Sequence, residues 1–384
     1  MIVFVVECPS PYHTPVLNRL QEELGDQLCV FYLYGADTSH GWGHVVATHR
    51  YIVLGHLRGR VALAKALLSP RLRAVGVYGY RGLARLVSAN VARLRGLPLV
   101  LRGAANVRDE SSRPAFRRLL KRWYLRMLVG QPEVWTNGSA NTAYWRLLGL
   151  RRHHLIPYAL QQLPGNESGA AALRAGLGLT ERFVFTFVGR LESIKGVSDL
   201  LQAYDVVRQA VPAGTTALVI VGSGSLEPQV RQYVDAHDDC RYLGTIPQQR
   251  LGAVYAAADV FVAPSHREPW GWVINEALGF GTRVIASVEM ASADDLCTEE
   301  TGRRCPVADP SALASAMLAE YRAGPRRARR LECQDTARIM ADRLRELTGH
   351  RISVRLQRLP ESDSAPDAAT GPDLSPPPQG ARQL

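Results

Sequence analysis

Short apolar runs alternate with amphipathic segments along the second half of the chain, and this alternation strongly limits the folds open to it. The apolar runs predict buried strands at 183–188, 217–221, 240–243, 259–263 and 282–286. Segments with helical spacing lie between or after them, at 197–208, 226–236, 251–257 and 311–320. Strands that alternate with helices form a parallel sheet covered by helices on both faces. The second half is therefore predicted to be a doubly wound α/β domain.

The first half repeats the alternation less clearly. Its predicted strands are 2–7, 29–34, 51–54, 74–78, 97–101, 134–137 and 154–158, and its clearest helices are 15–24, 83–94 and 139–148. A chain of 384 residues exceeds one ordinary hydrophobic core and suits two domains. The predicted fold class is therefore α/β, with two doubly wound, Rossmann-like domains.

Composition places the domain boundaries. We expect an N-terminal domain at 1–160, a polar linker containing Gly and Pro at 161–172, and a C-terminal domain at 173–350. A last long helix, 330–347, is expected to return to the first domain. From 359 to 384 the chain is rich in Ser, Pro, Asp and Ala, which predicts a disordered tail.

Charge and cysteine usage limit the class of partner and the compartment. The net charge of +11 indicates anionic partners, such as phosphorylated substrates or an acidic membrane face, although an arginine-rich proteome gives the same charge without any partner. No apolar run reaches 18 residues, and the N-terminus lacks the basic start of a signal peptide. The six cysteines are scattered along the chain, and no two of them form a Cys-x2-Cys pair. This pattern argues against a zinc site and favours the reducing cytoplasm.

Two carboxylates stand seven residues apart in the segment 266–287. Glu268 precedes Pro269, and Glu276 lies two turns into a helix that is predicted to begin at about Pro269. Gly279 and Gly281 are expected to end this helix. Its N-terminus offers free N–H groups to an anion or to sugar hydroxyls. The alternative is that both carboxylates are solvated, but the Pro-Trp-Gly start and the apolar strands on either side favour a binding cleft.

Three further polar patterns follow predicted strands of the second half. Arg190 and Lys195 flank a helix start, which suits a diphosphate site, although a solvated turn has the same composition. Gly222-x-Gly224 is a weak dinucleotide fingerprint, and its simpler role is a tight turn or a close backbone approach to a ligand. The pairs Asp238-Asp239 and Asp294-Asp295 lie in polar turns, and we expect them to be solvated. We therefore predict no metal site.

The first half supplies candidates for a second substrate. Tyr12 and His13 follow the first predicted strand, and the polar loop from Arg102 to Ser112 follows another. Loops after the carboxyl ends of parallel strands are where doubly wound sheets bind ligands. Tyr12, His13 and Arg102 are therefore predicted to face an acceptor, although a lone histidine is more often structural.

The segment 113–130 is a predicted basic amphipathic helix. Its basic residues alternate with apolar ones, among them Leu119, Leu120, Trp123 and Met127. Such a helix suits an anionic membrane surface. The alternative is an ordinary helix whose apolar face packs on the sheet while the arginines cover the outside.

Taken in order, the motifs of the second half are FVGRLESIKG (187–196), VIVGSGSLEPQV (219–230), YLGTIP (242–247) and the segment 254–287 with its Glu-x7-Glu. With this set the chain resembles the retaining glycosyltransferases of family 4, strongly over about 183–310 and more loosely in the first half. The resemblance implies the GT-B architecture, in which two Rossmann-like domains face a cleft. It also implies sugar transfer from a nucleotide-diphosphate sugar with retention of configuration, without a cofactor or a required metal.

The resemblance also implies roles for matching residues. Arg190 and Lys195 would hold the donor diphosphate, and Glu276 would bind the ribose hydroxyls. Glu268 would contact the transferred sugar, either as a nucleophile or as a group that stabilises an oxocarbenium-like state. The backbone N–H groups of Gly271, Trp272 and Val273 would contact the sugar or phosphate. The backbone of Leu243, Gly244 and Thr245 would face the base.

These implications predict the reaction and its partners. We expect a cytoplasmic glycosyltransferase, with possible contact at the inner membrane face through 113–130, that acts on a glycan or lipid-linked acceptor in cell-surface polysaccharide or glycoconjugate biosynthesis. Two alternatives stay open. One is a nucleotide-sugar epimerase of the same architecture, and the other is a basic protein that binds polyanions or membrane surfaces. No module for nucleic-acid recognition is apparent, so nucleic acid is not an expected partner.

Overall fold

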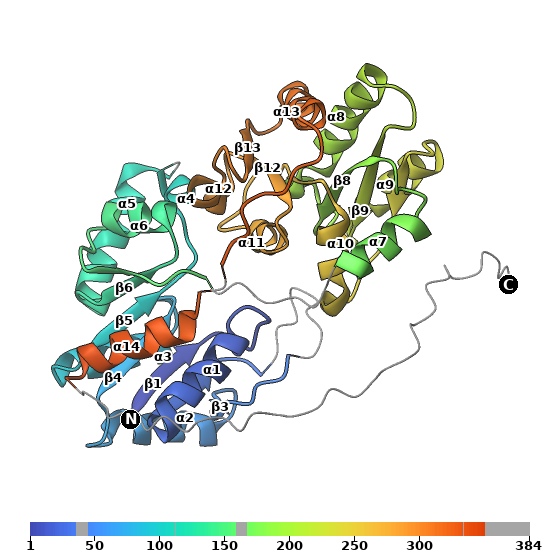
Figure 1. The fold of residues 1–384 in the computed structure, drawn as a ribbon. Coiled ribbons are helices and arrows are strands. Elements are labelled where there is room, and N and C mark those ends of the chain that lie inside the picture. Colours follow the sequence, from blue (N-terminus) through green and yellow to red (C-terminus); the bar gives the residue numbers. More distant parts are fainter. Residues whose placement is uncertain (36–44, 112, 159–166, 333, 350–384) are drawn as a thin grey trace, which may run out of the picture.

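The computed structural model describes residues 1–35, 45–111, 113–158, 167–332 and 334–349. These residues form two α/β domains, drawn in blue to teal and in green to orange in Figure 1. The domains meet where α6 (Ser139–Leu147) of the first packs against α12 (Ala291–Leu296) of the second. The two-domain α/β fold predicted from the alternation of strands and helices is therefore correct.

The N-terminal sheet is entirely parallel within the described residues. Its strands are β1 (Ile2–Val6), β2 (Leu28–Tyr32), β3 (Tyr51–Val53), β4 (Ala74–Tyr78), β5 (Leu99–Arg102), β6 (Glu133–Thr136) and β7 (His153–Leu155). They run in the order β3-β2-β1-β4-β5-β6-β7. The helices of this domain are α1 (Thr14–Leu24), α2 (Leu57–Leu68), α3 (Leu83–Leu94), α4 (Val107–Ser111), α5 (Ala115–Tyr124), its π-helical continuation η2 (Leu125–Val129), and α6.

The C-terminal sheet is also parallel. Its strands are β8 (Phe183–Val188), β9 (Thr216–Val221), β10 (Cys240–Tyr242), β11 (Val260–Ala263), β12 (Arg283–Ser287) and β13 (Gly302–Cys305), in the order β10-β9-β8-β11-β12-β13. The helices are α7 (Glu167–Gly176), α8 (Val197–Ala210), α9 (Glu227–Asp235), α10 (Leu251–Ala257), α11 (Trp272–Gly279), α12 and α13 (Pro310–Arg322). The buried side chains form one apolar cluster on each face of each sheet.

The last helix, α14 (Thr336–Leu347), lies with the first domain and packs against α1 (Figure 1). Its Met340 and Leu344 are fully buried in a cluster that includes strands of the N-terminal sheet. Two arginines add polar contacts, because Arg345 donates to the carbonyl of Glu23 at 2.9 Å and Arg343 pairs with Glu133 at 2.5 Å. The chain therefore crosses between the domains twice.

The structure corrects two boundaries. The predicted linker 161–172 begins outside the described residues, but 167–172 belong to α7, so the helical part of the second domain starts earlier than composition suggested. The predicted helix 330–347 begins only at Thr336, where the side chain of Asp335 accepts a hydrogen bond from the backbone N–H of Arg338. The predicted tail 359–384 lies outside the described residues.

The topology brings the two candidate binding regions together. In each sheet the strand order reverses next to the first strand, at β1 between β2 and β4 and at β8 between β9 and β11. Ligands of doubly wound sheets bind at such switch points, outside the carboxyl ends of the strands. Tyr12 and His13 follow β1, whereas Arg190 and Lys195 follow β8.

Candidate active site

The helix that carries Glu276 starts three residues later than predicted. It begins at Trp272, and Pro269 lies outside it because Gly271 adopts the left-handed conformation with φ 96°. A Cβ at Gly271 would lie 2.4 Å from the methyl group of Met290. Only glycine fits this position without strain, so Gly271 sets where the helix and its free N–H groups begin.

Glu276 is buried on α11 and has a specific hydrogen-bond donor. The hydroxyl of Tyr255, on α10, donates to its Oε2 at 2.6 Å. Burial raises the pKa of Glu276, and the Tyr255 hydrogen bond only partly opposes this rise. The structure therefore holds a desolvated carboxyl group on α11, at the residue to which the resemblance assigns ribose binding.

Glu268 lies next to the predicted diphosphate-binding loop. Its carboxylate forms an ion pair with Lys195, in the turn η3 (Ser193–Lys195), and both side chains are about four-fifths buried. The next residue, Gly196, has φ 69°, and a Cβ there would lie 2.2 Å from the carbonyl oxygen of Pro264. Glycine thus lets the loop after β8 reach the loop after β11. Arg190 is exposed on the same loop.

The Gly222-x-Gly224 motif joins loops to one another. A Cβ at Gly222 would lie 1.8 Å from the carbonyl oxygen of Gly189, and one at Gly224 would lie 2.5 Å from that of Leu191. The backbone N–H of Leu191 donates to Ser223 at 2.8 Å. The two glycines therefore allow the loops after β8 and β9 to touch, which favours the tight-turn interpretation and fixes the loop that carries Arg190.

The predicted base-facing segment lies at the edge of this loop cluster. Leu243, Gly244 and Thr245 follow β10, and the carbonyl of Gly244 accepts a hydrogen bond from the N–H of Gly222 at 2.8 Å. The hydroxyl groups of Thr245 and Ser223 are 3.0 Å apart. The segment is thus tied to the carboxyl ends of the C-terminal strands, beside the other donor-site candidates.

Tyr12 connects the two domains directly. Its ring stacks on Trp272 with centroids 4.5 Å apart and planes 13° from parallel. Burial, and then the nearby carboxylates Glu276 and Glu268, raise the pKa of its hydroxyl. A side chain of the acceptor-side loop therefore lies against the start of α11 and near both members of the Glu-x7-Glu pair.

His13 is part-buried and Arg102 is buried in the first domain. The ring of His13 contacts Tyr78 edge-on at 5.2 Å, and burial followed by the charge of Arg102 lowers its pKa to about 3. The guanidinium of Arg102 lies 5.1 Å from the ring of Tyr158 and donates to the carbonyl of Ile156 at 3.1 Å. Its Nε and Nη1 are buried and have no hydrogen-bond partner among the described atoms.

The expectation that the acidic pairs are solvated was wrong for Asp294 and Asp239, which are part-buried in ion pairs, whereas Asp238 and Asp295 are exposed. Asp294 forms an ion pair with Arg108 of α4 at 2.7 Å, and Asp295 accepts a hydrogen bond from the backbone N–H of Ser139 at 2.9 Å. Both contacts cross between the domains. In the other pair, Asp239 lies within the C-terminal domain and pairs with Arg208 at 3.3 Å.

An aromatic contact completes the interface and was not predicted from sequence. Trp270 is buried, donates from its indole nitrogen to Asn275 at 2.9 Å, and meets the ring of Tyr158 edge-on at 5.4 Å. A Cβ at Gly138 would lie 2.6 Å from the Trp270 ring and 2.3 Å from Asp295. The two domains are therefore packed against each other beside the site.

The basic helix presents its apolar side to the solvent. Five large apolar side chains of α5 and η2 are 52–69% exposed: Phe116, Leu119, Leu120, Trp123 and Met127. Their spacing places them on one stripe of a helix. The interpretation in which this face packs on the sheet is therefore wrong for these residues, although Leu125 and Val129 of η2 are buried in the core.

Two properties are limited to the described residues. None of their helices is long and apolar enough to cross a membrane. They also contain no group of three or more His, Cys, Asp or Glu side chains placed to hold a metal ion.

Comparison with solved structures identifies the architecture. The chain is similar to the HepE protein of Anabaena in complex with UDP, with a TM-score of 0.64 and 17% identity over 91% of this chain and 97% of that one. It is also similar to WaaG, a glycosyltransferase involved in lipopolysaccharide biosynthesis, with a TM-score of 0.59 and 14% identity over 91% and 98% of the two chains. The fold is therefore the two-domain GT-B fold predicted from sequence.

Sequence comparison finds a family match within the second domain. Residues 182–322 match the family described as glycosyl transferases group 1. The chain is 34% identical over 174 residues to the D-inositol 3-phosphate glycosyltransferase of Thermomonospora curvata, which covers 42% of this chain and 40% of that protein. It is 35% identical over 149 residues to the glycogen synthase of Mycobacterium tuberculosis, with 37% and 36% covered. These alignments span less than half of each relative, and they confirm the glycosyltransferase resemblance inferred from the motifs.

Proposed function

We propose that the protein is a retaining, metal-independent glycosyltransferase of family 4 that moves a sugar from a nucleotide-diphosphate sugar to a hydroxyl acceptor. One observation carries the proposal. Tyr12, from the first loop of the N-terminal domain, stacks on Trp272 and lies near both Glu268 and Glu276. The acceptor-side loop and the two carboxylates thus share one site between the domains.

The donor occupies the loops of the C-terminal domain. Arg190 and Lys195 hold the diphosphate, where two cations stabilise the charge of the departing nucleotide without a metal ion. The buried carboxyl group of Glu276 binds the ribose hydroxyls. The N–H groups at Gly271, Trp272 and Val273 bind sugar hydroxyls or phosphate oxygens at the start of α11. The segment Leu243, Gly244 and Thr245 faces the base.

Glu268 contacts the transferred sugar beside the diphosphate. Its ion pair with Lys195 keeps the carboxylate next to the cation that would bind the leaving group. A negative charge at this position stabilises the positive charge that develops on the sugar ring as the bond to the diphosphate breaks. The new bond forms to the acceptor oxygen from the same face, which preserves the anomeric configuration.

The acceptor lies against the first domain, in contact with Tyr12. The guanidinium of Arg102 carries two buried nitrogen atoms without partners among the described atoms and sits beside His13. Such a group favours an anionic or polyhydroxylated acceptor, such as a glycan or a lipid-linked sugar. Work in cell-surface polysaccharide or glycoconjugate biosynthesis, in the cytoplasm, fits an acceptor of this kind.

A peripheral contact with an anionic membrane would present a lipid-linked acceptor to this cleft. The exposed stripe of α5 and η2 provides the apolar contact, and arginines on the same helix provide the charge. The alternative function is membrane binding alone, through this stripe, in which case the protein does not bind a nucleotide sugar.

Thermal stability against UDP-, GDP-, ADP- and dTDP-sugars tests the proposal. A donor at about 100 times its dissociation constant adds roughly 2.7 kcal/mol to the folded state. We expect a rise in Tm with one nucleotide and no rise in Glu276→Ala. Analysis of the product then separates transfer to an acceptor from epimerisation of the donor. A folded protein that responds to no donor, with or without a lipid extract, contradicts the proposal.

A further inference from the structure

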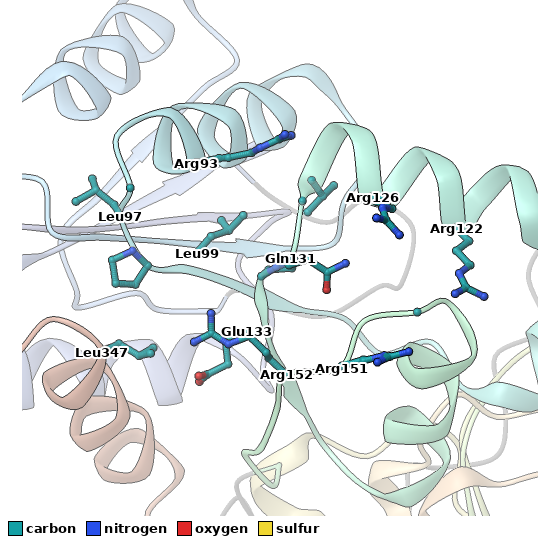
Figure 2. Close-up of a pocket in the computed structure, with 16 residues that line it drawn as sticks. Arg93, Leu97, Leu99, Arg122, Arg126, Gln131, Glu133, Arg151, Arg152 and Leu347 are labelled. Carbon is teal, nitrogen blue, oxygen red and sulfur yellow. The ribbon is translucent and has the colours of Figure 1, made fainter.

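A cavity of about 870 Å³ lies at the amino-terminal ends of strands in the N-terminal sheet (Figure 2). Its walls include Leu99 at the start of β5, Glu133 at the start of β6 and Arg152 just before β7. Tyr12 and His13, in contrast, follow the carboxyl end of β1. Because the described strands of this sheet run in parallel, the cavity and the proposed catalytic cleft lie at opposite ends of the strands.

Arginines from three separate segments surround this cavity. Figure 2 shows one on α3, two on α5 and η2, and two on the loop before β7. They are Arg93, Arg122, Arg126, Arg151 and Arg152. Among the described residues, none of these five forms an ion pair with a carboxylate. All five side chains are exposed, so water screens much of the repulsion between their charges, and a bound anion would relieve what remains.

The carboxylate in the cavity wall is already neutralised. Glu133 accepts hydrogen bonds from Nε and Nη2 of Arg343, at 2.9 and 2.5 Å, and from the indole nitrogen of Trp135 at 3.1 Å. Burial alone would raise the pKa of Glu133, but Arg343 and Trp135 outweigh it and lower the pKa. Glu133 is therefore ionised and paired with Arg343, which leaves the charge of the other arginines uncompensated.

One of the arginines is held by a backbone hydrogen bond, and a second lies close to a glycine. Arg93 donates to the carbonyl of Met127 at 3.0 Å and so ties α3 to η2. Arg122 lies across Gly149, where φ is 83° and a Cβ would come within 2.8 Å of its Nε. The glycine admits the guanidinium at a point where any larger residue would displace it.

We propose that this cavity is a second anion-binding site that takes a phosphate-bearing ligand, separate from the donor site. Guanidinium groups bind phosphate oxygens in a planar, paired geometry, and five of them around one space match a phosphoester. The cavity volume also falls in the range of small-molecule sites, so it accepts more than a bare phosphate ion.

The phosphate can come from a lipid headgroup or from a soluble phosphorylated molecule. The lipid source has a structural neighbour, because Arg122 and Arg126 lie on the same helical segment as the exposed Trp123 and Met127. A headgroup in the cavity would place this stripe at the acyl boundary of a membrane. A soluble phosphate ester would fill the cavity without using the stripe.

The test measures binding of two matched probes to the full chain. One probe is sn-glycerol 3-phosphate. The other is vesicles of phosphatidylglycerol in phosphatidylcholine, compared with pure phosphatidylcholine. All proteins carry Arg190→Gln, so that the proposed diphosphate site contributes little. The test variant is Arg151→Gln/Arg152→Gln. The control is Arg58→Gln/Arg73→Gln, which loses the same charge at positions of the same domain that are also exposed but do not line the cavity.

We expect at least a tenfold loss of affinity in the cavity variant and less than a twofold loss in the control. Binding of glycerol 3-phosphate indicates a soluble ligand, whereas binding of phosphatidylglycerol vesicles alone indicates a headgroup, and either supports the site. Absence of binding to both probes, or equal losses in the two variants, overturns it. Neither result bears on the proposed transferase function, which is tested separately by donor binding and product analysis.

Discussion

Arg108 and Asp294 lie on opposite domains, and one guanidinium nitrogen, Nη2, reaches both carboxylate oxygens at 2.7 and 2.8 Å. The neighbouring Asp295 accepts the backbone N–H of Ser139 across the same boundary. Both side chains of the ion pair are about three-quarters buried, so water screens the pair only in part. These contacts hold the two domains in a closed arrangement.

Removal of this contact is expected to loosen the closed arrangement. In Arg108→Ala, Asp294 keeps only a 3.3 Å contact with the exposed Arg304, and a part-buried pair of this kind contributes roughly 1 kcal/mol. The ratio of closed to open molecules should fall about fivefold, which small-angle scattering detects as a larger radius of gyration. Arg231→Ala, which removes an exposed pair within one domain, is the control. An unchanged radius in Arg108→Ala would show that the aromatic contacts alone hold the domains together.

Glu276 is expected to reduce the stability of the free protein at neutral pH. Its folded-state pKa is raised above the usual value of 4.5, so the folded protein keeps a proton that the unfolded chain has already lost. Stability therefore declines as pH rises from about 4.5 to the folded-state pKa, by at most about 1.4 kcal/mol per pH unit from this group. Glu276→Gln should have a higher Tm than wild type at pH 8, and the difference should shrink toward pH 4.5.

The same substitution should weaken binding of the nucleotide sugar, because the neutral amide is a poorer acceptor for ribose hydroxyls. Tyr255→Phe is a matched variant that removes the hydrogen bond to the carboxylate and keeps the charge. It should lower Tm at pH 8. If Glu276→Gln is less stable than wild type across the whole pH range, the buried charge is better compensated than the structure indicates.

His13 is expected to make the protein less stable in acid, the opposite dependence on pH. Its pKa is lowered to about 3, so the unfolded chain takes up a proton below pH 6.5 while the folded protein does not. Stability falls as pH drops from 6.5 toward 3, by at most about 1.4 kcal/mol per pH unit from this group. Denaturant unfolding of His13→Gln should show a smaller loss between pH 6.5 and 5. His49, whose pKa is lowered to about 4, retains its share of the acid sensitivity. An unchanged slope in the variant would contradict the buried, neutral state of His13.

The sequence predicted most of the fold because buried parallel strands are continuous apolar runs. The prediction missed β13 because this strand, Gly302–Cys305, is not a continuous apolar run. It lies at the edge of the sheet, and its two arginines, Arg303 and Arg304, are exposed. It also missed α2, which contains Gly59 in its first turn. There, an added Cβ would lie 2.1 Å from the carbonyl oxygen of Val53, so the glycine is present for tertiary contact and lowers the local helical signal.

Within the site, local motifs predicted which residues gather but not what crosses between the domains. Glu268 and Lys195 came from the motif spacing, and the structure joins them in an ion pair. The partner of Asp294 lies 186 residues away in the chain, and nothing near either residue marks the pair. The stack of Tyr12 on Trp272 is equally non-local. Such contacts depend on how two independently formed sheets meet, which no short pattern encodes.

Tyr12 is expected to contribute through its ring more than through its hydroxyl. An offset or parallel stack of two aromatic rings is worth about 0.5–1.5 kcal/mol beyond the area it buries. Tyr12→Ala should reduce kcat/KM for the transfer reaction roughly tenfold, whereas Tyr12→Phe, which keeps the stack on Trp272, should reduce it less. The donor dissociation constant should change less than kcat/KM in either variant, because Tyr12 reaches the proposed donor site only through its stack on Trp272. Equal losses in the two variants would assign the effect to the hydroxyl near Glu268 and Glu276.

The exposed stripe of α5 is expected to bind membranes through its leucines. Leu119 and Leu120 are 69% and 62% exposed, and burial of a leucine side chain in an apolar phase is worth roughly 1.5–3 kcal/mol. Leu119→Ser/Leu120→Ser should therefore weaken binding to anionic vesicles at least tenfold in a sedimentation assay, without lowering Tm.

The matched control for this surface is Leu57→Ser/Leu68→Ser on α2, where both leucines are exposed to a similar extent on the same domain. The helix α2 carries fewer basic residues and no comparable stripe of five apolar side chains, so its variant should bind vesicles like wild type. If the α5 variant binds vesicles as tightly as the α2 control, the leucines contribute nothing and the binding is purely electrostatic. The affinity of both proteins would then fall steeply with ionic strength, since the apolar contact that resists screening by salt would be missing.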